Sequence, residues 1–377
     1  GATLSSGSFT DRDFAFHLNK GIKIYGGFAG METLLSQRSH STNPTILSGD
    51  IGMVGNVSDN CYHVFITTGL SSMAVLDGCR IRDGNADGAN FISYESNNFN
   101  QGEGGGLLMQ VSNMKLYNNL IYNNRAIEGG GLLNYGSTAS EMTNCLIFDN
   151  TATNRGGGIY ATASTMTVTN CTFYENNSAN GGGAVQNSNS SNLSLDNCLL
   201  WANASSGSEI INISPSTLTV NYSLMEMTHS GIGNIAGQNP LFVDESDPDG
   251  VDDILGTADD GLNLQSCSPA VDVGEDTASN PNVPLMDMLG NGRTSTTDMG
   301  SYEYNSSTPI PTIPVYVDIT ATGNNDGRSW TDAYTDLQDA IDHACEGREI
   351  WIAQGIYHPT RIPMGATLSS GSFTDRD

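Results

Sequence analysis

Residues 244–261 are the part of the chain whose side chains and spacing are best suited to binding a metal ion. Eight of these eighteen residues are Asp or Glu, and none is Lys or Arg. Such a loop repels itself unless a hard cation such as Ca2+ gathers the carboxylate oxygens. The spacing is not that of an EF-hand, and a solvated acidic loop is the alternative. The predicted calcium ligands are Asp247, Asp249, Asp252, Asp253, Asp259 and Asp260.

A second group of side chains could bind a partner through aromatic surface. Four aromatic residues recur about one period apart, each next to an apolar residue that is expected to point inward, so they should point outward. Because aromatic residues are enriched where proteins meet, the column is predicted to be a contact stripe for a glycan or a neighbouring chain. The alternative is stacking that only stiffens the fold. The stripe consists of Tyr122, Phe148, Tyr174 and Trp201.

Catalysis is the third chemistry to consider, because two carboxylates that face one groove can hydrolyse a glycosidic bond. Asp149 and Glu175 occupy equivalent positions one period apart and could lie close together. An exposed acidic stripe is the simpler interpretation, and no catalytic residue is predicted. The seven cysteines include no CxxC pair and the six His are scattered, so no zinc site is expected and calcium is the one predicted cofactor.

The elements that position these residues repeat along residues 104–203. Gly-Gly-Gly occurs at 104–106, 129–131, 156–158 and 181–183. A second signature begins with Asn and ends with Asn six residues later, at 118–124, 144–150, 170–176 and 197–203. The steps between its copies are 26, 26 and 27 residues. A short period with glycine and asparagine at fixed positions is typical of a solenoid.

The repeat is predicted to consist of strands. Apolar and polar residues alternate before each signature, as in Met166-Thr-Val168-Thr, which indicates a half-buried strand. Three short strands and three turns fit one period, and equivalent strands of successive coils then pair in parallel about 4.8 Å apart. The fold class is therefore all-β, a right-handed parallel β-helix. The expected inward column is Ile121, Ile147, Phe173 and Leu200, with Cys79, Cys145, Cys171 and Cys198 on the same face and Asn124, Asn150, Asn176 and Asn203 stacked at the next turn.

The charge of the chain excludes one class of binding partner, and its cysteines are expected to be part of the core. With 14 Lys plus Arg and 41 Asp plus Glu, the net charge is −27, which excludes binding to nucleic-acid phosphates as a main role. The cysteines of the inward column are predicted to be reduced and buried, although a spacing near 4.8 Å is compatible with a disulfide between neighbours. No segment approaches the length of a membrane-spanning apolar helix.

The two ends of the chain carry the same thirteen residues. Residues 1–13 and 365–377 are identical, at an offset of 364. Chance does not produce thirteen consecutive identities, so we expect a tandem array of near-identical domains, of which this chain covers one period and a short overlap. A secretion signal would then lie far upstream.

This interpretation divides the chain into three parts. Residues 1–304 are the body of one β-helix domain, whose C-terminal end is closed by residues 262–304. Residues 305–314, with three prolines in six residues, form a semi-rigid linker. Residues 315–377 begin the next copy with a short capping helix and its first coils. A capping box formed by Thr335 and Gln338 would start that helix, which would cover open strand edges.

Five segments, taken together, carry a family resemblance. They are Val-Tyr-Val-Asp at 315–318, Thr-Asp-Leu-Gln-Asp-Ala at 335–340, Ile-Trp-Ile-Ala-Gln-Gly-Ile-Tyr at 350–357, Ile-Tyr-Gly-Gly-Phe at 24–28 and Asp-Met-Gly-Ser-Tyr-Glu at 298–303. They resemble secreted β-helix domains of Bacteroidota of the choice-of-anchor Q type. The Gly-Gly-Gly triplets and Phe173-x-x-Asn176 are similar to repeats of chlamydial polymorphic membrane proteins, which are surface adhesins. The resemblance implies extracellular display, commonly after type IX secretion, and no established reaction.

The expected function follows from the array and the resemblance. We expect a structural and adhesive repeat domain of a giant secreted cell-surface filament, used in attachment, gliding or prey contact. Its partners would be other copies of the repeat, bundled with cations that offset the acidic repulsion, and a cell-surface glycan or protein. The alternative is a β-helix polysaccharide lyase or glycoside hydrolase, since this fold also hosts such enzymes, and fold alone does not decide function.

Overall fold

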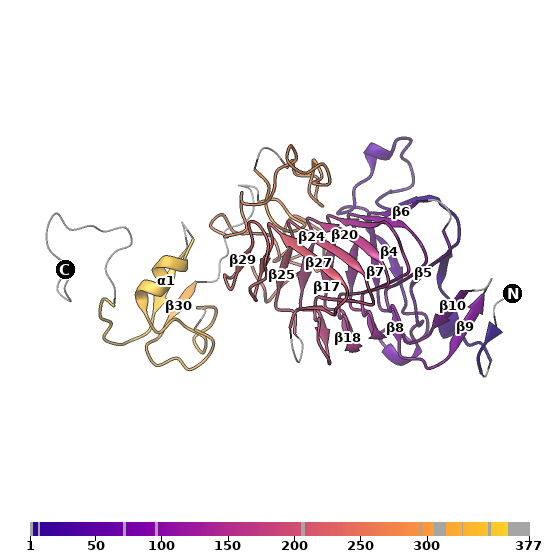
Figure 1. The fold of residues 1–377 in the computed structure, drawn as a ribbon. Coiled ribbons are helices and arrows are strands. Elements are labelled where there is room, and N and C mark those ends of the chain that lie inside the picture. Colours follow the sequence, from indigo (N-terminus) through magenta and orange to yellow (C-terminus); the bar gives the residue numbers. More distant parts are fainter. Residues whose placement is uncertain are drawn as a thin grey trace. The chain divides into compact units, whose positions relative to one another are not determined.

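The computed structural model forms two compact units. The first, called the body, comprises residues 1–264 and 268–308, and the second, called the C-terminal unit, comprises residues 265–267 and 309–377. Figure 1 shows the body as a stack of coils. The structure describes residues 3–6, 8–70, 73–94, 97–204, 208–293, 296–304, 314–325, 327–345 and 348–360.

Three long parallel sheets run along the body. Sheet 1 contains β2 (Phe16–Leu18), β5 (Phe65–Thr68), β11 (Leu107–Gln110), β15 (Leu132–Tyr135), β19 (Ile159–Thr162), β23 (Val185–Ser188) and β26 (Ile210–Asn212). Sheet 2 contains β3 (Lys23–Tyr25), β6 (Ala74–Asp77), β12 (Met114–Tyr117), β16 (Ser140–Thr143), β20 (Thr165–Thr169), β24 (Asn192–Asp196) and β27 (Thr217–Asn221). Sheet 3 contains β4 (Thr45–Ser48), β7 (Cys79–Arg82), β13 (Leu120–Tyr122), β17 (Leu146–Phe148), β21 (Thr172–Tyr174), β25 (Leu199–Trp201), β28 (Leu224–Met225) and β29 (Ile235–Ala236).

Smaller elements complete the coils. A short parallel sheet, sheet 4, follows sheet 3 in the coil and contains β8 (Asn85–Ala86), β14 (Arg125–Glu128), β18 (Thr151–Arg155) and β22 (Asn177–Ser178). An antiparallel sheet near the N-terminus contains β1 (Thr3–Leu4), β9 (Phe91–Tyr94) and β10 (Asn97–Asn100). Single turns of 3-10 helix occur at Asp11–Asp13, Leu35–Gln37 and Val57–Asp59.

The parallel coils confirm the architecture predicted from the repeat. Each strand pairs with its counterpart one coil later, so that Ile121 lies opposite Ile147, and Ile147 opposite Phe173. These side chains and that of Leu200 are fully buried in one core cluster. The cysteines of the inward column are buried in the same cluster, and Cys145 N–H lies 3.4 Å from the sulfur of Cys171. The alternation of the sequence therefore specifies which face of each strand becomes core.

Stacked asparagines hold the turn that follows sheet 3. The side-chain amide of Asn124 donates to Asn150 (3.0 Å), that of Asn150 to Asn176 (3.0 Å), and that of Asn176 to Asn203 (2.9 Å). All four side chains are buried. The residue before each has a positive φ, as at Asn123 (53°), where Asn is better tolerated than most residues. The predicted asparagine ladder is confirmed.

Stacking of the coils also brings two carboxylates together, those of Glu103 and Glu128. Glu103 forms a parallel bridge with Glu128 of the next coil. Burial, followed by repulsion from Glu128, raises the pKa of Glu103 to about 7. The folded state therefore holds a proton that the unfolded chain releases near pH 4.5, so this group stabilises the fold below that pH. The contribution is lost as the pH rises to about 7.

Replacing Glu103 with Gln is expected to remove this loss. The variant should be more stable than the wild type at pH 8 by about 1–3 kcal/mol and nearly equal to it at pH 4.5. Urea unfolding at the two pH values measures the difference. Asp11→Asn, at an exposed position, is the control for loss of one charge. A Glu103→Gln variant with the same pH dependence as the wild type would contradict the assignment.

After β29 the chain stops coiling and returns along the outer face of sheet 3. We call residues 240–264 and 268–304 of the body the covering segment. Gly300 N–H donates to Asn197 C=O (2.8 Å), and the Asn144 amide donates to Met286 C=O (2.7 Å). The expectation that residues 262–304 close the C-terminal end of the coil is therefore wrong. The physical reason is that sheet 3 presents outward apolar residues, such as Leu146 and Leu199, which the segment buries.

The described residues of the C-terminal unit form one short helix and two strands. β30 (Val315–Val317) pairs in parallel with β31 (Ile350–Ile352), and α1 (Leu337–His343) packs on β30 through the buried Ala340. The predicted short helix is thus confirmed, but its capping box is not. Asp336 is the N-cap and accepts from Gln338 N–H (2.8 Å), while Thr335 N–H donates to Asn325 (2.8 Å). Residues 305–313 of the predicted linker lie outside the described residues, as do residues 361–377.

The cysteines divide into one disulfide and five free thiols. Cys267 and Cys345, both in the C-terminal unit, are bonded with a Cα–Cα distance of 5.4 Å. This pair was not predicted from the sequence, because 78 residues separate its members. The remaining five cysteines are buried and unbonded. Burial raises the pKa of Cys198 to about 12, so its thiol is protonated and unreactive at neutral pH.

Candidate functional site

The acidic loop of the covering segment turns some predicted calcium ligands inward. Asp260 is fully buried and accepts from Gly256 N–H (2.7 Å), Thr257 N–H (3.0 Å) and the Tyr302 hydroxyl (2.6 Å). Burial raises its pKa to about 6 even so. Asp259 accepts from Asp252 N–H (3.2 Å) and from the Thr257 hydroxyl (2.7 Å). These carboxylates therefore shape the loop itself.

The other predicted ligands remain at the surface. Desolvation, followed by repulsion from the carboxylates of Asp249, Asp244 and Asp253, raises the pKa of Asp247. Across the described ranges, no three acidic, His or Cys side chains are grouped so that they could hold a metal ion. Calcium binding by this loop stays a prediction.

Calcium is expected to raise the melting temperature of the chain by about 2 °C or more relative to a chelator. Asp247→Asn with Asp249→Asn should remove this effect, because the exposed end of the loop would lose two oxygen anions. Asp149→Asn with Glu175→Gln makes the same charge change on an exposed turn elsewhere in the body. Equal melting curves in calcium and in chelator would eliminate the site.

The predicted contact stripe lies outside the core column, as expected, but it is covered. Tyr174 is only 2% exposed, and the other three aromatic residues of the stripe are partly buried in the same cluster. Phe242 of the covering segment packs edge-on against Tyr174, with ring centroids 5.5 Å apart, and Phe148 stacks on Tyr174 at 5.9 Å. The expectation of an exposed stripe is therefore wrong, because the sequence period does not reveal the segment that returns over it.

Arg293 fastens the covering segment to the coils. Its side chain is fully buried, forms an ion pair with Glu303, and donates to Asn144 Oδ1 (3.2 Å) and to Gly300 C=O (2.9 Å). Asn144 belongs to a coil and lies 149 residues away in the sequence. One guanidinium therefore joins a turn of the solenoid to two points of the covering segment.

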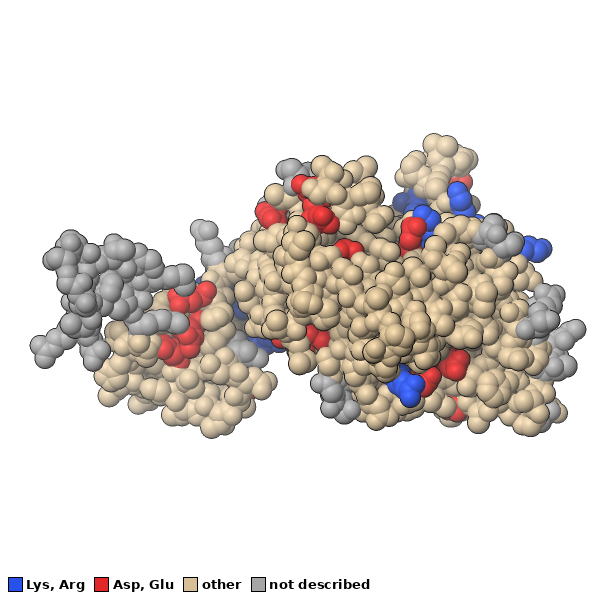
Figure 2. Space-filling view, in the orientation of Figure 1, with Lys and Arg blue, Asp and Glu red and all other residues tan. Residues whose placement is uncertain are grey.

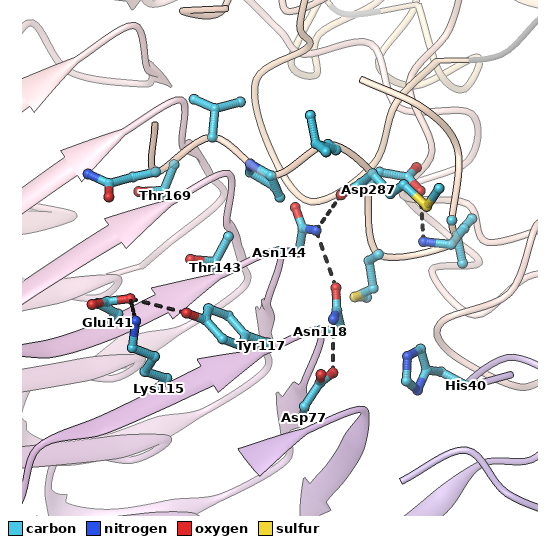
Figure 3. A pocket seen from close by; sticks show the side chains of 18 of the residues that line it. His40, Asp77, Lys115, Tyr117, Asn118, Glu141, Thr143, Asn144, Thr169 and Asp287 are labelled. Carbon is cyan, nitrogen blue, oxygen red and sulfur yellow. Dashed lines mark hydrogen bonds and ion pairs between the residues drawn. The ribbon is translucent and has the colours of Figure 1, made fainter. Parts of the chain in front are cut away.

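An open groove lies beside the covering segment, on the outer face of sheet 2. Its volume is about 760 Å³. Its floor is formed by outward residues of β6, β12, β16 and β20, and its two walls are the loop 35–41 and residues 281–290 (Figure 3). Lys115 and Tyr117 point outward from β12, while Met114 and Leu116, which alternate with them, are buried in the core. Alternation along one strand therefore supplies both the core and the groove.

The cations of the groove are paired with carboxylates. Lys115 Nζ lies 2.8 Å from Glu141 Oε2, which also accepts from the Tyr117 hydroxyl at 3.1 Å. The hydrogen bond to Glu141 raises the pKa of Lys115, and burial raises the pKa of Tyr117. Arg38 lies 2.6 Å from Asp77. At neutral pH the Lys115 amine and the Tyr117 phenol both keep their protons.

A line of hydrogen bonds joins the floor of the groove to its wall. The Asn118 amide donates to Asp77 (2.9 Å), and the Asn144 amide donates to Asn118 (3.2 Å) and to Met286 C=O (Figure 3). Leu285 and Met286 at the wall are 74% and 60% exposed. The groove thus combines fixed polar groups of little net charge with an apolar rim, a lining that suits an uncharged ligand rich in hydroxyl groups.

Asp149 and Glu175, the candidate hydrolytic pair, lie elsewhere. Both are exposed on the turn after sheet 3 and have positive φ angles of 47° and 52°. Partial burial raises the pKa of Asp149; partial burial followed by the Asp149 charge raises that of Glu175. They are neighbours in one column, as predicted, but they do not line the groove.

Sequence reasoning missed the groove because its walls come from segments far apart in the chain. One signal could have indicated part of it: Lys115 and Glu141 occupy paired outward positions in successive coils. Nothing in the repeat indicates that residues 281–290 return beside them. On the face shown in Figure 2 uncharged residues predominate over Lys, Arg, Asp and Glu.

Comparison with known proteins supports the fold. Residues 134–245 match the family described as "Right handed beta helix region", which establishes the predicted handedness of the parallel β-helix. The match includes most of the asparagine ladder and the strands β16 and β20 of the groove floor. No curated protein matches the chain. None of the helices that the structure describes is long and apolar enough to cross a bilayer.

Proposed function

We propose that this chain is a repeat domain of a giant secreted cell-surface filament that serves attachment, gliding or prey contact. The observation that carries the proposal is the identity of residues 1–13 with residues 365–377. A segment that recurs unchanged 364 residues later in one chain is typical of a tandem array. An array of stacked parallel coils is mechanically suited to a filament, because each coil contacts only its neighbours along one axis.

The dimensions of the body and the chemistry of the chain agree with this proposal. Among the described residues, sheet 3 has eight strands, which at the usual spacing gives a stack roughly 35 Å long. The disulfide between Cys267 and Cys345 is typical of proteins in oxidising, extracytoplasmic compartments. With a net charge of −27, several chains would bundle only with cations that offset their repulsion.

Electron microscopy of the purified native material tests the filament. Rods or multi-stranded fibres with a regular axial repeat are expected, and they should separate into single strands when divalent cations are removed. Isolated compact particles that contain a single copy of the domain would contradict the proposal.

The groove on sheet 2 is the surface that best supports adhesion, since the aromatic stripe is covered. Its paired charges, its hydroxyl groups and its exposed Leu285 and Met286 suit a neutral glycan of a cell surface. A catalytic role in a polysaccharide lyase is the second candidate, favoured by Lys115 and Tyr117 beside Glu141 in an open groove. Lysine must lose its proton to act as the base, and its raised pKa opposes that loss.

Glycan binding and cleavage are distinguished by one set of assays. The chain is expected to retain surface glycans without releasing new reducing ends or unsaturated products from pectin- and alginate-type polymers. Tyr117→Ala should weaken retention about tenfold, because it removes both a hydroxyl and a ring from the groove floor. Tyr135→Ala, which removes a 44% exposed tyrosine from the outer face of sheet 1, should leave retention unchanged. Unsaturated products would favour the lyase, and equal retention by both variants would exclude the groove.

A further inference from the structure

The first coil of the body is an open end of the stack. Within the residues that the structure describes, strands β2, β3 and β4 are the end strands of sheets 1, 2 and 3. The inward column that begins at Phe16 is uncovered there: Phe16 is 53% exposed, whereas Phe65 and Leu107, the next members of its column, are 4% and 0% exposed. Leu18, the other inward residue of β2, is 5% exposed. An apolar core that ends on open strand edges is a surface to which a further strand can add.

The C-terminal unit carries a strand edge of the matching kind. Val315 N–H donates to Glu349 C=O (2.8 Å), and Ala353 N–H donates to Val317 C=O (2.7 Å). Because backbone groups alternate along a parallel ladder, those of Ile350 and Ile352 then point to the other edge of β31. Within the described residues, β31 pairs with β30 and with no other strand. The Ile352 side chain is 47% exposed.

The sequence places the two edges one coil apart. Residues 365–377, at the end of the C-terminal unit, repeat residues 1–13. We call this thirteen-residue segment, which precedes the first coil, the leader. The rest of the C-terminal unit therefore stands directly before the leader of a first coil. With the offset of 364, the Phe16 of the following copy comes 30 residues after Ile350. Successive strands of sheet 1 from β11 to β23 begin 25, 27 and 26 residues apart. A step of 30 residues therefore corresponds to one coil with a slightly longer turn.

The leader itself is built onto the coils of the body. Arg12 donates to Asn60 C=O (2.8 Å) and to Asn85 C=O (2.9 Å), and its guanidinium lies 4.2 Å from the centre of the Tyr62 ring. The identical leader at 365–377 contains the same arginine. The leader of a following copy would therefore be anchored to its coils through this arginine. Because only a short stretch of chain separates β31 from that anchor, β31 can reach only the first coil of the following copy.

We infer that the C-terminal unit docks on the first coil of the next copy of this chain, with β31 pairing in parallel with β2 of that copy. Ile350 then lies opposite Phe16, and Ile352 opposite Leu18, with all four side chains facing the interior. α1 packs on the same face of β30 through Ala340, so it closes the end of the coil against water. The partner is a second copy of the chain, and the inference rests on the tandem arrangement proposed above.

An extended chain tests the docking. Residues 14–304 are appended after Asp377, so that a second body follows the repeated leader, and hydrogen exchange of the Ile352 amide is compared with that in residues 1–377 at low concentration. Pairing should slow this exchange about tenfold or more. Phe16→Asp in the appended body alone should restore fast exchange, whereas Val251→Asp, at a 92% exposed position, should not. Circular dichroism confirms that both variants keep the coil.

The outcome is independent of the filament test. If the Ile352 amide exchanges at the same rate in both chains, the docking is wrong, even if native material forms rods. Slow exchange that persists in the Phe16→Asp variant would also overturn it, since the protection would then come from another contact. Slow exchange that this variant abolishes supports the docking whether or not the native chains bundle into fibres.

Discussion

Phe173→Ala is expected to lower the free energy of unfolding by about 3–5 kcal/mol, because the removed ring leaves a cavity that rigid neighbours cannot fill. Phe173 is fully buried and lies between Ile147 of the preceding coil and Leu200 of the next. Stacked coils fix these neighbours through the backbone hydrogen bonds of two adjacent strands. The coils therefore cannot close up, and the cost should lie near the upper part of the range.

Urea unfolding followed by circular dichroism measures this change. Phe91→Ala is the matched control, since Phe91 is 48% exposed on β9 and its removal should change stability by no more than about 0.5 kcal/mol. A loss below about 1 kcal/mol in Phe173→Ala would show that Phe173 faces water, and the inward column would have to be abandoned.

Arg293→Ala is expected to weaken the attachment of the covering segment by a similar free energy, about 3–5 kcal/mol. The reason is that the substitution leaves the buried Glu303 without its cation. It also leaves the side chain of Asn144 and the carbonyl of Gly300 each short of a donor. The loss should be confined to the attachment of the covering segment, since the hydrogen bonds between coils do not involve Arg293. The core of the coils should remain folded.

Tryptophan fluorescence separates release of the covering segment from global unfolding. Trp201 is partly buried against the cluster that this segment completes. In a background in which Trp330 and Trp351 are replaced with Phe, Arg293→Ala should shift the emission of Trp201 to longer wavelength while the circular dichroism is retained. Arg125→Ala removes an exposed arginine from a coil and should leave emission unchanged. Simultaneous loss of both signals would show that segment and coils unfold as one unit.

The coil itself could be predicted from the sequence because its information is local and repeated. Each signature specifies two turns and one buried strand residue, and the same register recurs from Ile121 to Leu200. The asparagine ladder and the burial of the cysteines follow from that register, since equivalent positions must stack. The helix of the C-terminal unit was also recognisable from its apolar spacing, although Asp336 rather than Thr335 is its cap.

What lies against the outside of the coil was decided only by the tertiary structure. The covering segment has no period, and its attachment depends on single contacts across long distances, such as that between Arg293 and Asn144, 149 residues apart. Outward leucines and aromatic residues show that a surface is apolar; they do not specify whether the same chain or another covers it. The groove exists because the same chain covers this surface: its second wall is formed by residues 281–290, which return beside Lys115 and Glu141. Period and alternation determine how a chain stacks upon itself, whereas contacts between non-repeating segments depend on the three-dimensional path of the backbone.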